Sequence, residues 1–338
     1  MNLAIVGTGL VSPIGLTPLH HACFPRAGIG LRPASAFVGR DGEPVPVFHC
    51  PWLGAKLPVA DRLAALATHA LRAASEALDQ VLPQETALLL CLGPARAGLA
   101  EVDRQGAAGA ITESLKVPLR RVFTGSASVF AALGVADRLL SDGEVRAVLV
   151  AAVDSFVSLE AVRAETAMAP ATWVREPPPL SEAAAAVALM RGAEARELGL
   201  SRGAVHYSST RKGRGNDDDD EIVDGTALAA LLEQLPALGA LVVRAYGQEE
   251  VDRLRQTEWT CAADRNVGRL HGRLTTASVE RWTGRIGGAA GAASLVYGLT
   301  AERHHAALEA PAGPGPFVAW AVSRDGTRGL CAATATGA

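Results

Sequence analysis

Residues 3–15 read Leu-Ala-Ile-Val-Gly-Thr-Gly-Leu-Val-Ser-Pro-Ile-Gly and form the most distinctive stretch of the chain. The apolar start predicts a buried strand, and the Gly-Thr-Gly at 7–9 predicts a tight loop after it. A dinucleotide fingerprint also places glycines after a strand, but it needs a third glycine and an acidic residue about 20 positions later. Ser12 occupies the third glycine position and no acid follows at that distance, so no nucleotide site is indicated.

Strands and helices alternate from this stretch to the end of the chain. In the first half, the apolar pattern predicts helices over 60–79 and 129–141 and strands over 86–92, 121–123, 147–153 and 183–190. In the second half, it predicts helices over 226–234 and 289–299 and strands over 240–243, 317–322 and 330–335. This alternation indicates a layered α/β protein, and its recurrence in both halves suggests a duplicated fold.

The composition of the 338 residues, 49% hydrophobic and 20% charged, is typical of a globular protein with a buried core. The net charge is −3 and the basic residues are scattered, so nucleic acid is not an expected partner. No apolar run has the length of a membrane span and no signal peptide is seen, which makes the cytoplasm the expected location. The five cysteines are far apart and form no CxxC pair, so we expect reduced, mostly buried thiols.

Charged and histidine-containing segments give no sign of a metal site. Residues 211–224 combine three basic residues with the acidic run 217–221, which predicts a solvated loop. The eight histidines have no metal-ligand spacing. We therefore expect neither a metal nor a cofactor.

Five stretches, in the same order, resemble the β-ketoacyl synthases of the thiolase superfamily over nearly the whole chain. Residues 3–15 are similar to that family's opening strand and Val-Ser-Pro-Ile-Gly loop. The other matches are to the nucleophile turn and helix, the following strand, the Gly-Glu-Gly-Ala-Ala segment and a glycine-rich helix start, at 126–143, 147–155, 179–185 and 284–292. The resemblance implies the thiolase-like five-layered α/β/α/β/α fold of two similar halves with mixed β-sheets. These halves would span 1–195 and 196–338.

The family works with one cysteine and two histidines, and this chain departs from that triad at all three positions. Ser126 stands at the position of the cysteine, Tyr246 at that of the first histidine and Arg285 at that of the second. A serine hydroxyl needs a base before it can attack, and Arg285 cannot accept a proton. The usual decarboxylative condensation is therefore not expected. A plainer interpretation of Ser126 is a residue that caps the following helix or lies in the turn before it.

Further residues enter the candidate site as substrate-binding positions. Arg285 is expected to bind a carboxylate, phosphate or thioester oxygen, or to pair with a buried acid such as Glu182 or Glu280. Gly326 lies in a shortened closing loop that corresponds to the family's second oxyanion donor. His271 is the histidine that we expect near enough to act as a rescuing base.

Two functions from different classes remain open. The first is a non-condensing partner subunit, similar to chain-length factors, that binds acyl chains or acyl carrier protein in fatty-acid or polyketide biosynthesis. It would form a homodimer, or a heterodimer with an active ketosynthase, along the strand before Ser126. The alternative is an acyltransferase or thioester hydrolase that uses Ser126 as its nucleophile on an acyl-CoA or carrier thioester. A homodimeric acyl-binding scaffold without chemistry is the plainest possibility.

Overall fold

The computed structural model describes residues 3–29, 31, 34–38, 42, 44–54, 56–167, 178–213, 225–238, 242–248, 253–304 and 315–336. The acidic run 217–221, expected to be a solvated loop, lies outside these residues. No helix in the described part of the chain is long and apolar enough to cross a membrane.

Ten strands form one mixed sheet in the order β10-β9-β11-β12-β8-β1-β7-β6-β4-β5. The first half contributes β1 (Leu3–Val11), β4 (Thr86–Leu92), β5 (Leu119–Thr124), β6 (Ala147–Ser155) and β7 (Glu182–Arg191). The second half contributes β8 (Gly203–Lys212), β9 (Val242–Gly247), β10 (Leu270–Ser278), β11 (Phe317–Val322) and β12 (Thr327–Ala335). A separate two-stranded sheet pairs β2 (Ala34–Val38) with β3 (Pro44–Val47).

The two halves have the same topology. In the first half, β5, β4 and β6 are parallel, and β7 and then β1 follow in antiparallel pairing. In the second half, β10, β9 and β11 are parallel, and β12 and then β8 follow in the same way. The halves join through a short antiparallel pairing of Leu3–Ile5 with Gly203–Val205. This repetition confirms the expected fold of two similar halves with mixed strands. The expected boundary after residue 195 falls within α6 (Gly192–Glu197).

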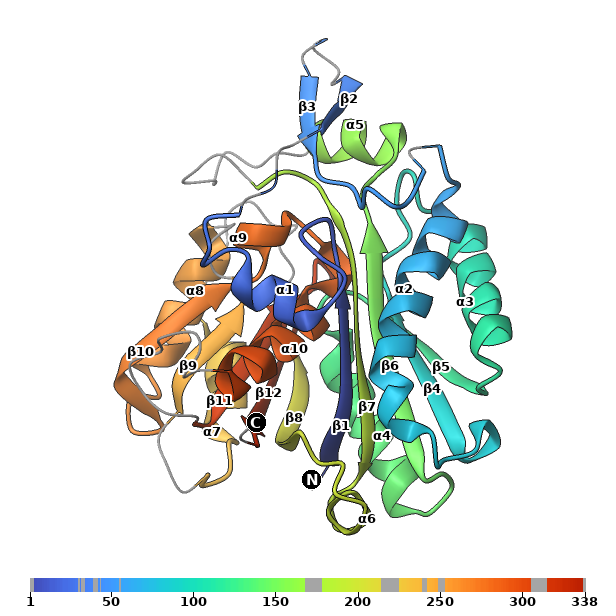
Figure 1. Ribbon diagram of the computed structural model, residues 1–338. Helices are drawn as coiled ribbons and strands as arrows, with labels where there is room; N and C mark the ends of the chain where they lie inside the picture. Colours follow the sequence, from blue (N-terminus) through green and yellow to red (C-terminus); the bar gives the residue numbers. More distant parts are fainter. Residues whose placement is uncertain are drawn as a thin grey trace.

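Helices on both sides of the strands complete five layers (Figure 1). The central layer consists of α4 (Ser128–Ser141) and α10 (Ala290–Arg303), which share one core cluster with the inner faces of both halves. The outer layer of the first half contains α2 (Val59–Ser75) and α3 (Glu101–Leu115). That of the second half contains α7 (Thr226–Glu233) and α8 (Arg253–Asp264).

The local sequence explains these elements. Pro58 precedes α2, whose leucines and alanines recur at helical spacing and are buried on one face. The strands β4, β6 and β11 are continuous apolar runs because helices cover both of their faces. Three shorter helices lie in the segments that follow β1, β6 and β10. They are α1 (Pro18–Cys23), α5 (Leu159–Ala167) and α9 (Glu280–Thr283).

All five cysteines are free, and Cys50, Cys91 and Cys331 are buried, as expected. Burial raises the pKa of the Cys91 and Cys331 thiols to about 12. It also raises the pKa of the Cys50 thiol strongly, with help from the nearby Glu182 carboxylate. These thiols are therefore protonated at neutral pH and lack the thiolate that nucleophilic chemistry requires.

Candidate functional site

A cavity of about 140 Å³ lies where the two central helices begin. β5 leads through Gly125 and Ser126 into α4, and the short turn Gly287–Ala289 leads into α10. Because the halves share one topology, both helix starts are brought to the same place. The cavity is lined from both sides, by Ser126, Arg96, Asp154, Phe156, Gln248 and Arg285 among others.

Ser126 faces this cavity but does not cap the helix. Its hydroxyl donates a hydrogen bond to the carbonyl oxygen of Gly287, at 2.9 Å. The residue before α4 is Ala127, which provides no side-chain cap, and the Ser128 hydroxyl donates to the carbonyl of Gly125. The N-cap interpretation of Ser126 is therefore wrong, whereas its placement in the turn before the helix is confirmed, and its hydroxyl bridges the two halves.

Glycines allow the two helix starts to approach each other. Gly125 has a φ of +98°, which favours glycine, and this turn brings the chain from β5 into α4. A Cβ atom on Gly291, in the first turn of α10, would lie 2.4 Å from the carbonyl oxygen of Ser126. The close contact at the cavity thus depends on the absence of side chains.

Each arginine that lines the cavity has a carboxylate partner. Arg96 binds the fully buried Asp154 with both terminal nitrogens, one of them at 2.5 Å. Arg285 donates to Glu165 of α5 at 2.9 Å, and Arg324 donates to the same carboxylate. Burial alone would raise the pKa of Glu165, but the two arginines outweigh it and hold this pKa below its usual range. The expected pairing of Arg285 with an acid is thus made with Glu165.

Two of these guanidinium groups face one aromatic ring. Arg96 lies 4.1 Å and Arg285 5.8 Å from the ring centroid of Phe156. The negative face of an aromatic ring attracts cations, so Phe156 adds to the fixation that the carboxylates provide. The polar groups of the cavity are consequently held in place before any ligand arrives.

The fully buried Asp154 also fixes the backbone at the start of α10. Its carboxylate accepts the backbone N–H of Gly288 at 2.8 Å and that of Ser155 at 2.9 Å. Together with Arg96, these donors satisfy a carboxylate that would otherwise be costly to bury.

Tyr246 turns away from the cavity. Its hydroxyl donates to Glu302 of α10 at 3.0 Å, and its ring packs edge-on against Tyr297 and Phe317. Burial and the Glu302 charge raise the pKa of this phenol well above its usual value. Gln248, just beyond the end of β9, lines the cavity instead. It is buried, and its side-chain oxygen accepts the backbone N–H of Val322 at 3.1 Å.

Glu182 lies inside the protein, behind the cavity wall. Its carboxylate binds Arg62 of α2 at 2.9 Å and accepts hydrogen bonds from the Ser155 hydroxyl and the Cys50 backbone N–H. Both ion partners are completely buried. Glu182 thus ties α2 to the strands, and it does not line the cavity.

Gly326 also lies outside the cavity lining, and the backbone of His271 lies away from the cavity. Gly326 is in the turn between β11 and β12, where its carbonyl accepts from Gly213 and Arg328, while Ser323, just before it, lines the cavity. The backbone of His271 is at the start of β10, whereas the cavity lies beyond the far end of that strand, at Glu280. Seven residues of strand correspond to about 23 Å. The side chain of His271 is not among the described parts.

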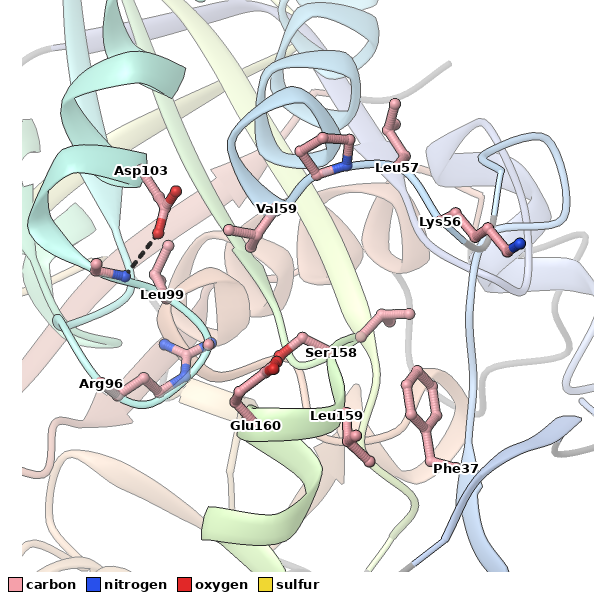
Figure 2. Close-up of a pocket in the computed structure, with 14 residues that line it drawn as sticks. Phe37, Lys56, Leu57, Val59, Arg96, Leu99, Asp103, Ser158, Leu159 and Glu160 are labelled. Carbon is pink, nitrogen blue, oxygen red and sulfur yellow. Dashed lines mark hydrogen bonds between the residues drawn. The ribbon is translucent and has the colours of Figure 1, made fainter.

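A larger cavity of about 420 Å³ lies next to the first one. It is bounded by the beginnings of α2, α3 and α5, with apolar side chains such as Leu57, Val59 and Leu99 on its walls (Figure 2). Arg96 lines both cavities. This side chain, held by Asp154, is therefore part of the wall between them.

Neither the family models nor the sequences of curated proteins match this chain. Its structure is similar to the ishigamide ketosynthase/chain length factor, with a TM-score of 0.71 and 21% identity over the whole of both chains. It is also similar to the ketosynthase from module 6 of the bacillaene synthase of Bacillus subtilis 168, with a TM-score of 0.78 and 13% identity. That match covers all of this chain and 73% of the other.

A third similar structure is a type II polyketide acyl-carrier protein in complex with its ketosynthase bound to the hexaketide. The TM-score is 0.72 and the identity 11%, over 99% of both chains. This chain has the ketosynthase fold. The thiolase-like α/β/α/β/α architecture expected from the five sequence matches is confirmed.

The cavity of this ketosynthase fold has an unusual chemical content. Among the described residues that line it there is neither a thiol nor an imidazole. Ser126 and Arg285 do meet there, as expected from the sequence, while Tyr246, Glu182 and Gly326 do not contribute to the lining. Gln248 and Asp154 were not among the predicted site residues. Asp154 follows the apolar run of β6 and is the acidic end of the matched stretch 147–155, whereas the segment before Gln248 contains Arg244 and gives no such signal.

Proposed function

We propose that this chain is a non-condensing, chain-length-factor-like subunit of a fatty-acid or polyketide-type assembly system. The observation that carries the proposal is the state of Ser126. Its hydroxyl donates its hydrogen bond to the Gly287 carbonyl oxygen. Among the described residues that line the cavity there is no thiol and no imidazole.

Condensation requires groups that are absent from the described residues lining this cavity. An acyl chain must be held on a nucleophile, and the malonyl thioester must be polarised as it loses its carboxylate. A helix N-terminus contributes at most about 2 kcal/mol, far too little to ionise a serine hydroxyl without a base. The guanidinium of Arg285 cannot accept a proton and is already paired with Glu165. Binding, rather than bond formation, is the role that remains for the cavity.

The ligand that suits this binding role is an acyl chain or an acyl group on its carrier protein. The two neighbouring cavities offer apolar walls near Leu57 and Leu99 and fixed polar groups near Ser126. Their shared wall is the Arg96 side chain. Similarity to a ketosynthase/chain length factor and to a ketosynthase in complex with its carrier protein supports this choice.

The partner surface of the proposal is the outer edge of β5. This strand is the last in the sheet and pairs with β4 on one side, and its side chains include the exposed Val122. An open edge of this kind can accept a strand from another protein. β5 leads directly to Ser126, so a partner bound here would lie close to the cavity.

The experiment that tests the proposal is intact-mass spectrometry after incubation with malonyl-CoA and a panel of acyl-CoA thioesters. We expect no covalent acyl adduct and no release of carbon dioxide from malonyl-CoA. Ser126→Ala, run in parallel, should behave like the wild type. An adduct that is present in the wild type and lost in Ser126→Ala would overturn the proposal and establish Ser126 as an acyl-transfer nucleophile.

The partner surface needs its own test. Val122→Lys places a charge at the centre of the β5 edge, and Val267→Lys makes the same change at another exposed valine, just after α8. In co-expression with an active ketosynthase, we expect Val122→Lys to abolish co-purification and Val267→Lys to preserve it. Equal yields of complex from both variants would place the partner elsewhere.

A further inference from the structure

A third cavity, of about 170 Å³, lies at the opposite end of α10 from Ser126. It is bounded by β1, the beginning of α1, the segment before β8 and the last turn of α10. The 14 residues of α10 span about 20 Å, which separates this cavity from the one at Ser126. Figure 1 shows α1 lying against α10 and β1 in this region.

The polar lining of this cavity is cationic. Arg202, Arg303 and His304 contribute to it, and no carboxylate is among the described residues that line it. Within the part of the chain that the structure describes, neither Arg202 nor Arg303 has an acidic partner. The buried Nε of Arg303 also has no hydrogen-bond partner there. The cavity thus contains donors and positive charge that the described residues do not satisfy.

The positive charges of the two guanidinium groups repel each other. Burial lowers the pKa of Arg303, and the positive charge of Arg202 lowers it further. Like charges that are brought together in this way are unfavourable unless an anion lies between them. The C-terminal end of α10 offsets only about half of one elementary charge.

Two arginines that are buried, unlike Arg202 and Arg303, have acidic partners. Arg62 has Glu182 as its partner, and Arg328 has Glu258. Unpaired buried charges are costly, so proteins usually supply such partners. Arg202 is exposed and Arg303 is partly buried, and neither has an acidic partner among the described residues, so both guanidinium groups are open to an anion from solution.

The shape and chemistry of the cavity define the class of this counter-ion. Guanidinium groups match the oxygens of a phosphate, and a phosphate dianion balances two positive charges. Thr17 also lines the cavity, so its hydroxyl lies beside the same anion site. Leu19, which is exposed, and Leu299 add apolar side chains to the lining. The volume is smaller than the roughly 300–1,000 Å³ of drug-sized pockets.

We propose that this cavity binds a phosphomonoester with a small apolar body. Its phosphate group lies between Arg202 and Arg303, and its apolar part contacts Leu19 and Leu299. This inference concerns a site remote from Ser126 and does not depend on the proposed partner role.

Isothermal titration calorimetry with phenyl phosphate and with inorganic phosphate, at constant ionic strength, tests the proposal. We expect saturable binding of phenyl phosphate with one site per chain, and weaker binding of inorganic phosphate. Arg202→Gln and Arg303→Gln should each weaken the binding of phenyl phosphate by about tenfold or more, because each removes a charge-assisted contact. Arg196→Gln, an exposed arginine on α6, is the matched control and should bind like the wild type.

Thermal unfolding of the same variants separates a binding site from a structural role. Removing one of two repelling charges should leave the ligand-free Tm of Arg303→Gln unchanged or slightly higher. Phenyl phosphate should then raise the Tm of the wild type but not that of the variant. The absence of saturable binding, or equal affinity in wild type and both variants, would overturn the site. Equal affinity for phenyl phosphate and inorganic phosphate would contradict the proposed apolar contacts and identify free phosphate as the ligand.

Discussion

The Ser126 hydroxyl and the Gly287 carbonyl oxygen lie 2.9 Å apart and form a hydrogen bond between the two halves of the molecule. Ser126 precedes the first central helix, and Gly287 precedes the second. This hydrogen bond therefore connects equivalent points of a duplicated fold. The serine proton is directed at a carbonyl, which cannot remove it.

A thiol at this position should regain reactivity. In Ser126→Cys, the N-terminus of α4 stabilises a thiolate, and the cavity gives access to it. We expect iodoacetamide to add one more carbamidomethyl group to this variant than to the wild type, as measured by intact mass and localised by peptide mapping. Ser128→Cys, at a buried position two residues later, should gain none in the native state. Failure of Ser126→Cys to gain a group would show that the cavity is closed to small electrophiles.

The buried pair of Glu182 and Arg62 should be essential for stability. Glu182→Gln leaves the guanidinium of Arg62 buried without its counter-charge, which costs about 3–5 kcal/mol of unfolding free energy. Urea denaturation measures this loss. Glu85→Gln, which alters a partly exposed pair with Arg146, should cost no more than about 1 kcal/mol. Similar losses in the two variants would contradict the structural role assigned to Glu182.

His21 should make stability depend on pH. Its Nδ1 lies 2.8 Å from the carbonyl oxygen of Thr17 and so carries the proton, while its Nε2 accepts from the Ser12 hydroxyl at 2.7 Å. Burial lowers the pKa of this imidazole to about 4. Between about pH 6.5 and 4 the His21 imidazole is protonated in the unfolded chain but stays neutral in the folded protein. The free energy of unfolding therefore falls as the pH falls through this range.

This loss amounts to about 3 kcal/mol for a shift of this size. Urea denaturation at pH 7 and at pH 4 measures it. His21→Gln removes the titrating group and should show a correspondingly smaller decrease. An unchanged pH dependence in His21→Gln would show that other groups are responsible.

Two glycines in the central layer should respond to alanine with opposite signs. In Gly291→Ala the new methyl group meets the carbonyl oxygen of Ser126, so we expect a loss of about 1–3 kcal/mol as the helix starts are forced apart. Gly134 in α4 has open space around the same position. Gly134→Ala should therefore gain about 0.5–1 kcal/mol from helix propensity. Thermal unfolding of both variants checks the sign, and a loss in both would argue against the close contact at Ser126.

The parts of the fold that were predictable from the sequence are those buried on both sides. β4, β6 and β11 appear as apolar runs whose expected bounds are nearly correct. β8 was missed because its residues from His206 onwards are polar and only partly buried. α3 was missed because Gly106 and Gly109 interrupt a weak apolar pattern. A partly buried element has a weaker hydrophobic periodicity in its sequence. Its conformation is then determined largely by tertiary packing, which the local sequence does not report.

The candidate site was predictable to a similar extent. Ser126 and Arg285 follow recognisable strand and helix boundaries, and they do line one cavity. The partner of Arg285 is Glu165, 120 positions earlier in the chain, and no local pattern reports such a pairing. β9 ends at Gly247, and the cavity is reached by Gln248 rather than by Tyr246. The end of a strand depends on its neighbours in the sheet, which the sequence of that segment does not contain.

The placement of β1 has a consequence for synthesis on the ribosome. This strand is made well before its neighbours in the sheet, β7 and β8, which begin at Glu182 and Gly203. At about 5–20 residues per second, translation reaches these partners only after roughly ten seconds or more. During that interval β1, which is apolar and is buried in the folded protein, has no neighbouring strand with which to form hydrogen bonds. The nascent chain must therefore be shielded, by a chaperone or by transient contacts, until its first half is nearly complete.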